Sequence, residues 1–248
     1  VAQTLGMLAV EKISVLVFRV APAVLSAVQQ QPAELRRYLL SMTEVLALAT
    51  FPVSIGLVLV ADDVVHLLLG EQWAGTTVAL ELLGIVGAYQ SICALLTRVL
   101  SVVGEVRLCM IVAWGTMGVL VPCFLFATRW GVAGVALVWV CVFPLTQIPL
   151  YLRLRTRIGL RLRDYAAALW PATSAVGVMV LGVAAVELAP AYHALPRPFH
   201  LGGTILVGAV LYTSTVLLVH GRRLRSIAGL LGSEARATAS NPVEDAPV

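Results

Sequence analysis

The chain has 248 residues, of which 60% are hydrophobic and only 12% are charged, and its formal net charge is +4. A soluble domain carries about 25% charged residues, so this composition argues against an ordinary soluble domain and indicates a polytopic membrane protein. Seventeen residues are basic, and all of them except Lys12 are arginine.

Seven apolar runs are each long enough to cross a bilayer as a helix, which takes about 20 residues. They cover residues 5–28, 39–60, 80–102, 108–127, 132–152, 166–188 and 201–219. The runs are too long for β-barrel strands and do not alternate polar with apolar residues. We therefore predict an all-α polytopic membrane protein, with a transmembrane domain over residues 1–220. Residues 221–248 end in a stretch of low apolar content and are predicted to form a cytoplasmic, disordered tail.

The connections between the runs alternate in charge. Basic connections follow the first, third, fifth and seventh runs, and they contain Arg36, Arg37, Arg107, the arginines of residues 153–164, Arg222, Arg223 and Arg225. The intervening connections hold one arginine at most, and the one after the second run carries Asp62, Asp63 and Glu71. Because cytoplasmic loops are enriched in arginine and lysine, the N-terminus of this chain is predicted to lie outside and the C-terminus in the cytoplasm.

The most basic stretch, RLRTRIGLRLRD at residues 153–164, holds five arginines and one aspartate. A nucleic-acid site needs a surface of matched shape, with stacking aromatics or a recognition element, and this short connection offers neither. We expect no nucleic-acid partner. The stretch is interpreted as a topological anchor, with contact to anionic membrane lipids as a secondary role.

Charged and polar residues inside the runs mark the candidate site, because charges at membrane depth are costly and default to functional hypotheses. In the first run, Lys12 and Arg19 fall on one helical face, with Glu11 nearby, and the alternative is an internal ion pair that only fixes packing. In the third run, Gln90 aligns with Thr97 and Ser101, and the adjacent Arg98 either faces the interior or extends to the headgroups. Glu44, Glu81 and Glu187 lie near the ends of runs and are expected to be interfacial.

The segment Asp62-Asp63-Val-Val-His66 has acids and a histidine near metal-ligand spacing. It continues into three leucines, which favours a short helix on the outer membrane surface that ends at Gly70, with Trp73 as an interfacial anchor. His193 and His200 are interpreted as loop residues. The chain has no metalloprotease, serine-hydrolase, P-loop or dinucleotide-binding motif, so we predict no catalytic residues, no metal site and no cofactor.

Four short motifs resemble one known group of transporters. Phe51-Pro52 and the following residues 59–61, 64–65 and 68–73 resemble the fP…l.a..lv.lllG..W signature of bacterial oligosaccharide and lipopolysaccharide flippases, the polysaccharide exporters of the MOP superfamily. Residues 21–26 resemble the P.ls segment of that family, while Gly104 and residues 130–136 match its usual turns. The resemblance covers residues 1 to about 220.

The resemblance implies about fourteen spans in two lobes, of which this chain holds the last seven. The N-terminal lobe would then be missing, either because the chain, which begins with Val1, is a fragment or because the gene product is short. The implied function is to flip an undecaprenyl-diphosphate-linked oligosaccharide across the bacterial cytoplasmic (inner) membrane by alternating access. By position, Lys12, Arg19 and Arg98 suit the diphosphate, with Glu11 beside them, and Gln90 suits the sugar.

Three alternatives remain open at this point. The first is another exporter of the same superfamily, for drugs or peptidoglycan precursors. The second is a scaffold subunit of a polysaccharide assembly complex that does not itself transport. The third, a membrane transferase or ligase, is disfavoured because no connection offers a sizeable polar domain for a donor.

Overall fold

The computed structural model describes residues 32–189, 192 and 196–240, with side chains for residues 33–189, 192 and 196–221. All regular secondary structure in these ranges is helical, as predicted. The long helices are α2 (Pro32–Leu59), α4 (Thr77–Val102), α5 (Val106–Ala127), α6 (Gly131–Ile158), α7 (Leu162–Glu187) and α9 (Arg197–Ser240). Short helices α3 (Ala61–Val64), η1 (Val65–Leu69) and η2 (Glu71–Thr76) connect α2 to α4, and η3 (Thr128–Trp130) connects α5 to α6.

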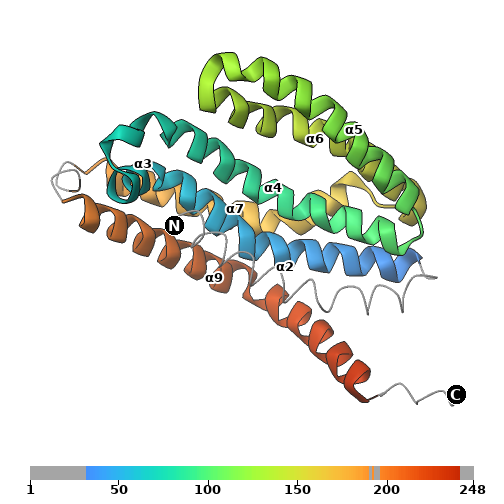
Figure 1. Cartoon of the computed structure of the whole chain (residues 1–248). Coiled ribbons are helices and arrows are strands. Elements are labelled where there is room, and N and C mark those ends of the chain that lie inside the picture. Colours follow the sequence, from blue (N-terminus) through green and yellow to red (C-terminus); the bar gives the residue numbers. More distant parts are fainter. Residues whose placement is uncertain (1–31, 190–191, 193–195, 241–248) are drawn as a thin grey trace, which may run out of the picture.

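Five helical stretches in the described part are long and apolar enough to cross a membrane: Ala33–Leu59, Glu71–Val102, Val106–Ile158, Leu162–Glu187 and Arg197–Gly221. The third stretch has 53 residues, which as one straight helix would measure about 80 Å, far more than the hydrocarbon core of about 30 Å. It folds back on itself, with α5 and α6 packed side by side as a hairpin (Figure 1). Each predicted run after residue 38 thus overlaps one long helix. The count of seven stays a prediction, because residues 5–28 lie outside the described residues.

Two helix ends differ from the predicted boundaries. Helix α2 begins at Pro32, seven residues before the predicted run, because proline is well suited to the first turn of a helix. Helix α9 continues to Ser240, so residues 221–240, predicted as a disordered tail, are helical and the prediction is wrong for them. This segment contains four alanines, four arginines and three leucines, which favour helix, and it has no proline, the next being Pro242. Residues 241–248 lie outside the described residues.

Helix α2 lies at the centre of the described bundle and packs against α4 on one side and α7 on the other (Figure 1). Helix α4 also contacts α6, and α9 packs against α7. A glycine allows α4 to approach α2 closely, because a Cβ atom on Gly84 would lie 2.7 Å from Val58 Cγ2 and 3.0 Å from the Ser54 carbonyl oxygen. Small residues at helix contacts are typical of membrane proteins, where close van der Waals packing replaces the hydrophobic driving force between helices.

The largest apolar core cluster joins α2, α4 and α6 in the half of the bundle nearest the α6–α7 turn. Its most deeply buried members include Leu39, Leu46, Leu95, Val99 and Leu154, each with no exposed surface. The cluster fixes the relative positions of three helices at the end where the chain carries most of its arginines.

The hairpin of α5 and α6 is closed by a tight connection of three residues, η3. Gly131 has φ +70°, in the left-handed region that favours glycine. A Cβ on Gly134 would lie 2.5 Å from the Ala127 carbonyl oxygen, so only glycine lets the start of α6 approach the end of α5 so closely. These two glycines explain the local sequence Trp130-Gly131-Val132-Ala133-Gly134.

Candidate functional site

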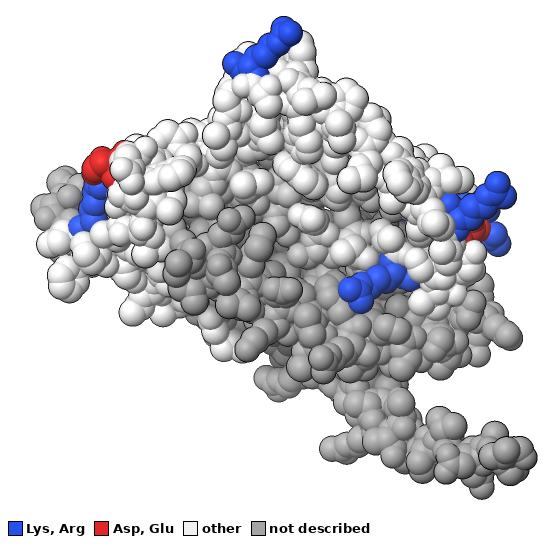
Figure 2. Space-filling view, in the orientation of Figure 1, with Lys and Arg blue, Asp and Glu red and all other residues white. Residues whose placement is uncertain are grey.

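Successive long helices are antiparallel, so the connections gather at two opposite ends of the described bundle. The end formed by the start of α2, the α4–α5 turn and the α6–α7 turn is called the basic end here. The other end, with α3, η1, η2, the η3 connection and the start of α9, is called the acidic end. Figure 2 shows basic groups around an acidic group at the right-hand end of the molecule, where the α4–α5 turn lies in Figure 1. The fold thus brings the predicted arginine-rich connections of the described part together.

Two ion-pair groups join the helices at the basic end. Glu105, in the α4–α5 turn, accepts hydrogen bonds from Arg153 Nε at 3.1 Å and Nη2 at 2.8 Å, and from Arg157 Nε at 2.8 Å. Arg36 at the start of α2 pairs with Asp164 at the start of α7. The hydrogen bonds from Arg153, and then those from Arg157, lower the pKa of the Glu105 carboxyl below its usual value. The carboxylate therefore stays ionised and holds α6 against the α4–α5 turn.

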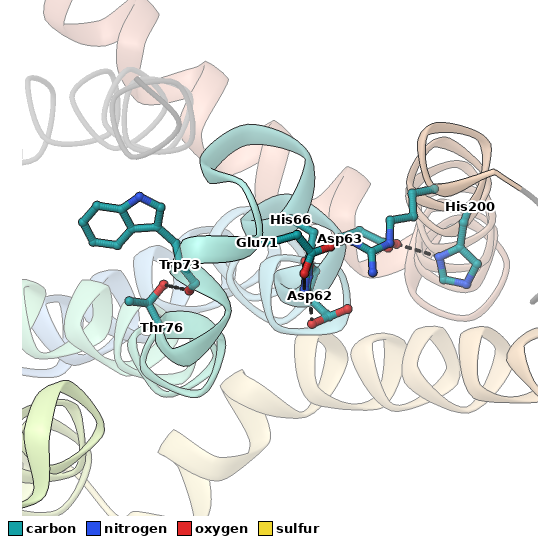
Figure 3. Close-up of polar contacts among 8 residues, drawn as sticks. Asp62, Asp63, His66, Glu71, Trp73, Thr76 and His200 are labelled. Carbon is teal, nitrogen blue, oxygen red and sulfur yellow. Dashed lines mark hydrogen bonds and ion pairs between the residues drawn. The ribbon is translucent and has the colours of Figure 1, made fainter.

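At the acidic end, Asp63 on α3 meets His200 on α9 (Figure 3). The distance from His200 Nδ1 to Asp63 Oδ2 is 2.6 Å, and the two side chains are 20% and 13% exposed. Tyr192 packs its ring 4.7 Å from the His200 ring and donates its hydroxyl to the His200 carbonyl oxygen at 3.1 Å. Tyr192 and Asp63 together hold His200, which was predicted to be a simple loop residue, at a contact between two distant parts of the chain.

A second histidine at the acidic end, His66, is surrounded by more exposed groups. Its Nδ1 lies 2.8 Å from the Asp62 carbonyl oxygen and 3.2 Å from Asp62 Oδ1, and its Nε2 lies 3.5 Å from Glu71 Oε2. Arg197 on α9 donates to Glu71 Oε1 at 3.0 Å. Among the described residues, no group of three or more His, Cys, Asp or Glu side chains is arranged to hold a metal ion.

The helix formed by α3 and η1 ends at Gly70, as the sequence predicted, and Gly70 has φ +91°. Its leucines Leu67, Leu68 and Leu69 are exposed, as is Trp73, whose indole points away from the histidine and the acids (Figure 3). An exposed apolar strip beside a polar cluster suits a helix lying at the membrane surface. Its position relative to a bilayer stays a prediction.

The predicted substrate-binding residues fall into two groups. Glu11, Lys12 and Arg19 lie outside the described residues, so their positions remain predictions. Gln90 and Arg98 both lie on α4 and are both exposed. They are eight residues apart, which places them about 80° apart around the helix.

The two hydroxyls predicted to align with Gln90 donate hydrogen bonds to carbonyl oxygens of α4 itself. Thr97 donates to the Cys93 carbonyl oxygen at 3.2 Å, and Ser101 donates to the Thr97 carbonyl oxygen at 2.9 Å. They satisfy their hydrogen bonds inside the helix, so they supply less to a binding surface than their spacing indicated.

Sequence reasoning missed the deepest carboxylate of the described part. Glu44 is 5% exposed and lies twelve residues into α2, about 18 Å from the start of that helix. The predicted run began near residue 39, whereas α2 begins at Pro32, so Glu44 lies further from the start of its helix than the sequence indicated. Its position relative to the membrane interface stays a prediction. Pro32 and Glu34 were the available signals, since both are typical of a helix start. A buried carboxylate in a membrane helix is a functional candidate by default.

Glu44 lies among other buried polar residues on α2. Thr43 and Thr50 are 0% and 1% exposed, and each donates its hydroxyl to the carbonyl oxygen four residues earlier, at 2.7 and 2.8 Å. Ser54 is 7% exposed and faces α4, where a Cβ on Gly87 would lie 3.0 Å from its Oγ. Helix α2 therefore carries the buried polar side chains of the described bundle's centre.

Comparison with known proteins connects the chain to polysaccharide biosynthesis. Residues 1–78 match the family model described as polysaccharide biosynthesis protein. An uncharacterized membrane protein in the cps region of Klebsiella pneumoniae is 29% identical over 127 residues, covering 51% of this chain and 26% of that protein. The teichuronic acid biosynthesis protein TuaB of Bacillus subtilis (strain 168) is 38% identical over 76 residues, covering 31% of this chain and 16% of that protein.

Among solved structures, the fold resembles that of the lipid II flippase MurJ in its inward closed conformation, with a TM-score of 0.65 and 14% sequence identity. The match covers 88% of this chain and 45% of the MurJ chain. The chain thus spans less than half the length of each protein that it matches. These likenesses support the resemblance predicted from the sequence: residues 1–78 match a polysaccharide biosynthesis family model, and the helices share the fold of the MurJ flippase.

Proposed function

We propose that this chain is one lobe of a transporter that flips a lipid-diphosphate-linked oligosaccharide across the bacterial inner membrane during polysaccharide biosynthesis. The proposal rests on one observation: the same chain matches both a family model and the fold of a solved structure. Residues 1–78 match a polysaccharide biosynthesis family, and 88% of the chain matches the fold of a flippase. A membrane protein with both properties is best explained as an exporter of polysaccharide precursors.

The transported molecule sets the chemistry that the lobe must supply. A diphosphate needs cationic groups, and a sugar needs hydrogen-bonding groups, in a hydrated cavity that opens to one side of the membrane at a time. We assign Lys12, Arg19 and Arg98 to the diphosphate and Gln90 to the sugar, with Glu11 as a neighbouring acid that tunes the cations. The buried Glu44 adds a further acidic group in the interior of the same lobe.

The orientation follows from the charges. With the basic end at the cytoplasmic face, the N-terminus of the chain lies outside and the C-terminus lies in the cytoplasm. The lipid-linked substrate would be assembled at the cytoplasmic face and released at the acidic end.

A single lobe cannot close a two-lobed cavity, so the proposal requires a second lobe. The 45% coverage of the MurJ chain is consistent with about half of such a transporter. The mass of the native gene product tests this point. A band near twice the 26.4 kDa of this chain supports two lobes in one polypeptide, whereas a band at 26.4 kDa requires a separate partner or a second copy.

Two other functions are less well supported. A drug or peptidoglycan-precursor exporter would share the fold, but the two relatives are a membrane protein in a cps region and a teichuronic acid biosynthesis protein. A scaffold subunit without transport activity would also have such relatives. It would tolerate changes at the interior cations, which gives a direct test.

The experiment uses the native full-length protein in a bacterium from which the corresponding gene has been deleted. Lys12→Glu combined with Arg19→Glu should lower surface polysaccharide at least about tenfold, which corresponds to about 1.4 kcal/mol of lost substrate binding. Arg129→Glu, in the exposed connection at the acidic end, is the matched charge-reversal control and should leave export unchanged. Normal export in the double variant at wild-type protein levels would refute a cavity role and favour the scaffold.

A further inference from the structure

A cavity of about 280 Å³ lies between α4, α6 and α7. Its walls are mostly apolar and include Leu96 from α4, Ile148 from α6 and Leu169 from α7. Ile148 is 46% exposed, so the cavity opens at the surface of the bundle. Gln90 and Arg98, the two predicted substrate-binding residues in the described part of the chain, are not among the residues that line it.

Two tyrosines in the cavity wall have hydroxyls without partners. The Tyr151 and Tyr165 hydroxyl oxygens are buried, and neither makes a hydrogen bond within the described part of the chain. Their ring centroids lie 6.1 Å apart, so the two side chains are neighbours in the cavity wall. A buried hydroxyl without an acceptor is unfavourable, and such groups in native proteins call for an explanation. A ligand that brings acceptor oxygens into the cavity would supply one.

Two arginines lie directly beyond these tyrosines at the basic end. Arg155 is four residues after Tyr151, on the same face of α6, and Arg161 is four residues before Tyr165, at the start of α7. Both are exposed. Within the described residues, the ion pairs of the basic end use Arg36, Arg153 and Arg157, whereas Arg155 and Arg161 form none. Their charges are therefore available to an anion.

We propose that this cavity binds one chain of an anionic diacyl phospholipid, with its ester carbonyls at the Tyr151 and Tyr165 hydroxyls and its phosphate at Arg155 and Arg161. The order of groups along the protein matches the order along the lipid. Toward the basic end, the apolar cavity wall is followed by the tyrosine hydroxyls and then by the arginine guanidinium groups. Along α6, Arg155 lies about 6 Å beyond Tyr151. In the lipid, acyl chain, ester and phosphate follow one another in the same direction.

The chemistry distinguishes this lipid from two others that a membrane offers. A zwitterionic phospholipid has the esters but no net charge, so it gains less from the two guanidinium groups. A polyprenyl phosphate has the charge but no ester carbonyls, so it would leave both tyrosine hydroxyls unsatisfied. The proposal does not rest on the transported substrate and goes beyond it, because the site would hold a resident membrane lipid.

Native mass spectrometry of the full-length protein in mild detergent tests the proposal, with phosphatidylglycerol, its ether-linked analogue, phosphatidylcholine and a polyprenyl phosphate added in turn. Phosphatidylglycerol should be retained in preference to the other three lipids. Arg155→Gln and Arg161→Gln should each weaken that retention about fivefold, the equivalent of about 1 kcal/mol per arginine near a membrane surface. Tyr151→Phe with Tyr165→Phe should abolish the preference for the ester over the ether lipid.

Arg163→Gln is the matched control, because Arg163 is exposed and lies in the first turn of α7, whereas Arg161 precedes that helix with an extended backbone. It should leave phosphatidylglycerol retention unchanged. An equal loss in Arg163→Gln would show diffuse charge attraction, and a preference for the polyprenyl phosphate would assign the cavity to the transported lipid. Either result overturns the proposal. Unchanged thermal midpoints in the glutamine variants establish that the fold is intact.

Discussion

Ion pairs join neighbouring elements at both the basic end and the acidic end, but the two ends differ in which charge is scarce. At the basic end carboxylates are scarce, and a single acid, Glu105, accepts from two arginines. At the acidic end carboxylates are plentiful, and histidines as well as Arg197 face them. Among the described residues, most of the arginines that remain exposed after these ion pairs are formed therefore lie at the basic end.

The two ends also differ in what their polar contacts join. The Asp63–His200 contact links residues 137 positions apart and is largely shielded from water. The Asp62–His66 contact lies within one short helix, and the Asp62 side chain is 66% exposed. Shielded, long-range contacts contribute more to stability than exposed, local ones, because the exposed pairs are well solvated when apart.

The largest expected effect comes from removing the charge difference between the ends. Replacing Arg155, Arg161 and Arg163 with glutamate should prevent correct insertion of α6 and α7, since arginine in short cytoplasmic loops sets the orientation of spans. The fraction of correctly oriented protein, measured with reporter fusions in the α6–α7 turn, should fall to a minority. Glutamate at Arg129 and Arg197, at the acidic end, should leave the orientation unchanged. A correctly oriented triple variant would contradict the assignment of the basic end to the cytoplasm.

A smaller effect distinguishes two adjacent aspartates at the acidic end. Asp63→Asn should lower the free energy of unfolding in detergent by about 1–3 kcal/mol, because it weakens a shielded charge-assisted hydrogen bond to His200. Asp62→Asn, at the exposed neighbour, should change it by no more than about 0.5 kcal/mol. Thermal or denaturant unfolding of the two full-length variants gives the comparison. Equal effects would mean that the His200 contact is not the one that stabilises this end.

The smallest effect is expected at Glu105 and depends on pH. The pKa of this carboxyl is lowered by Arg153 and Arg157, so its stabilising contribution is fully present above the unfolded value of about 4.3. It is lost as the pH falls through the still lower pKa of the folded protein. The thermal midpoint of wild type should exceed that of Glu105→Gln by a constant margin from pH 7 to about pH 4.5, and the margin should close below that range. A margin that closed well above this range would contradict the lowered pKa.

The apolar runs could be predicted because their length is set by the bilayer and needs no knowledge of tertiary contacts. Each predicted run after residue 38 overlaps one helix, and the end of η1 at Gly70 followed from a single glycine. The distance of Glu44 from the start of its helix could not be predicted correctly, because hydropathy alone placed the start of α2 about seven residues late. Hydropathy also ended α9 too early, since a polar segment with good helix formers continues a helix without being apolar.

The candidate sites were less predictable because they depend on which helices pack together. His200 was assigned to a loop, and nothing near it in the sequence indicates that it meets Asp63. The tyrosine pair of the cavity joins α6 to α7 across the α6–α7 turn. The sequence of that turn is dominated by arginines and does not indicate that the two tyrosines meet. The residues first assigned to the substrate, Glu11, Lys12 and Arg19, lie outside the described residues and stay predictions.

The hairpin of α5 and α6 has a consequence for the synthesis of the protein. The two helices contact each other extensively along their length, whereas α5 contacts α4 far less, and only three residues connect the pair. A connection this short, closed by Gly131 and Gly134, leaves no polar loop large enough to require separate translocation. The translocation machinery would therefore meet α5 and α6 as one unit, which enters the lipid as a preformed pair and docks on α4 afterwards.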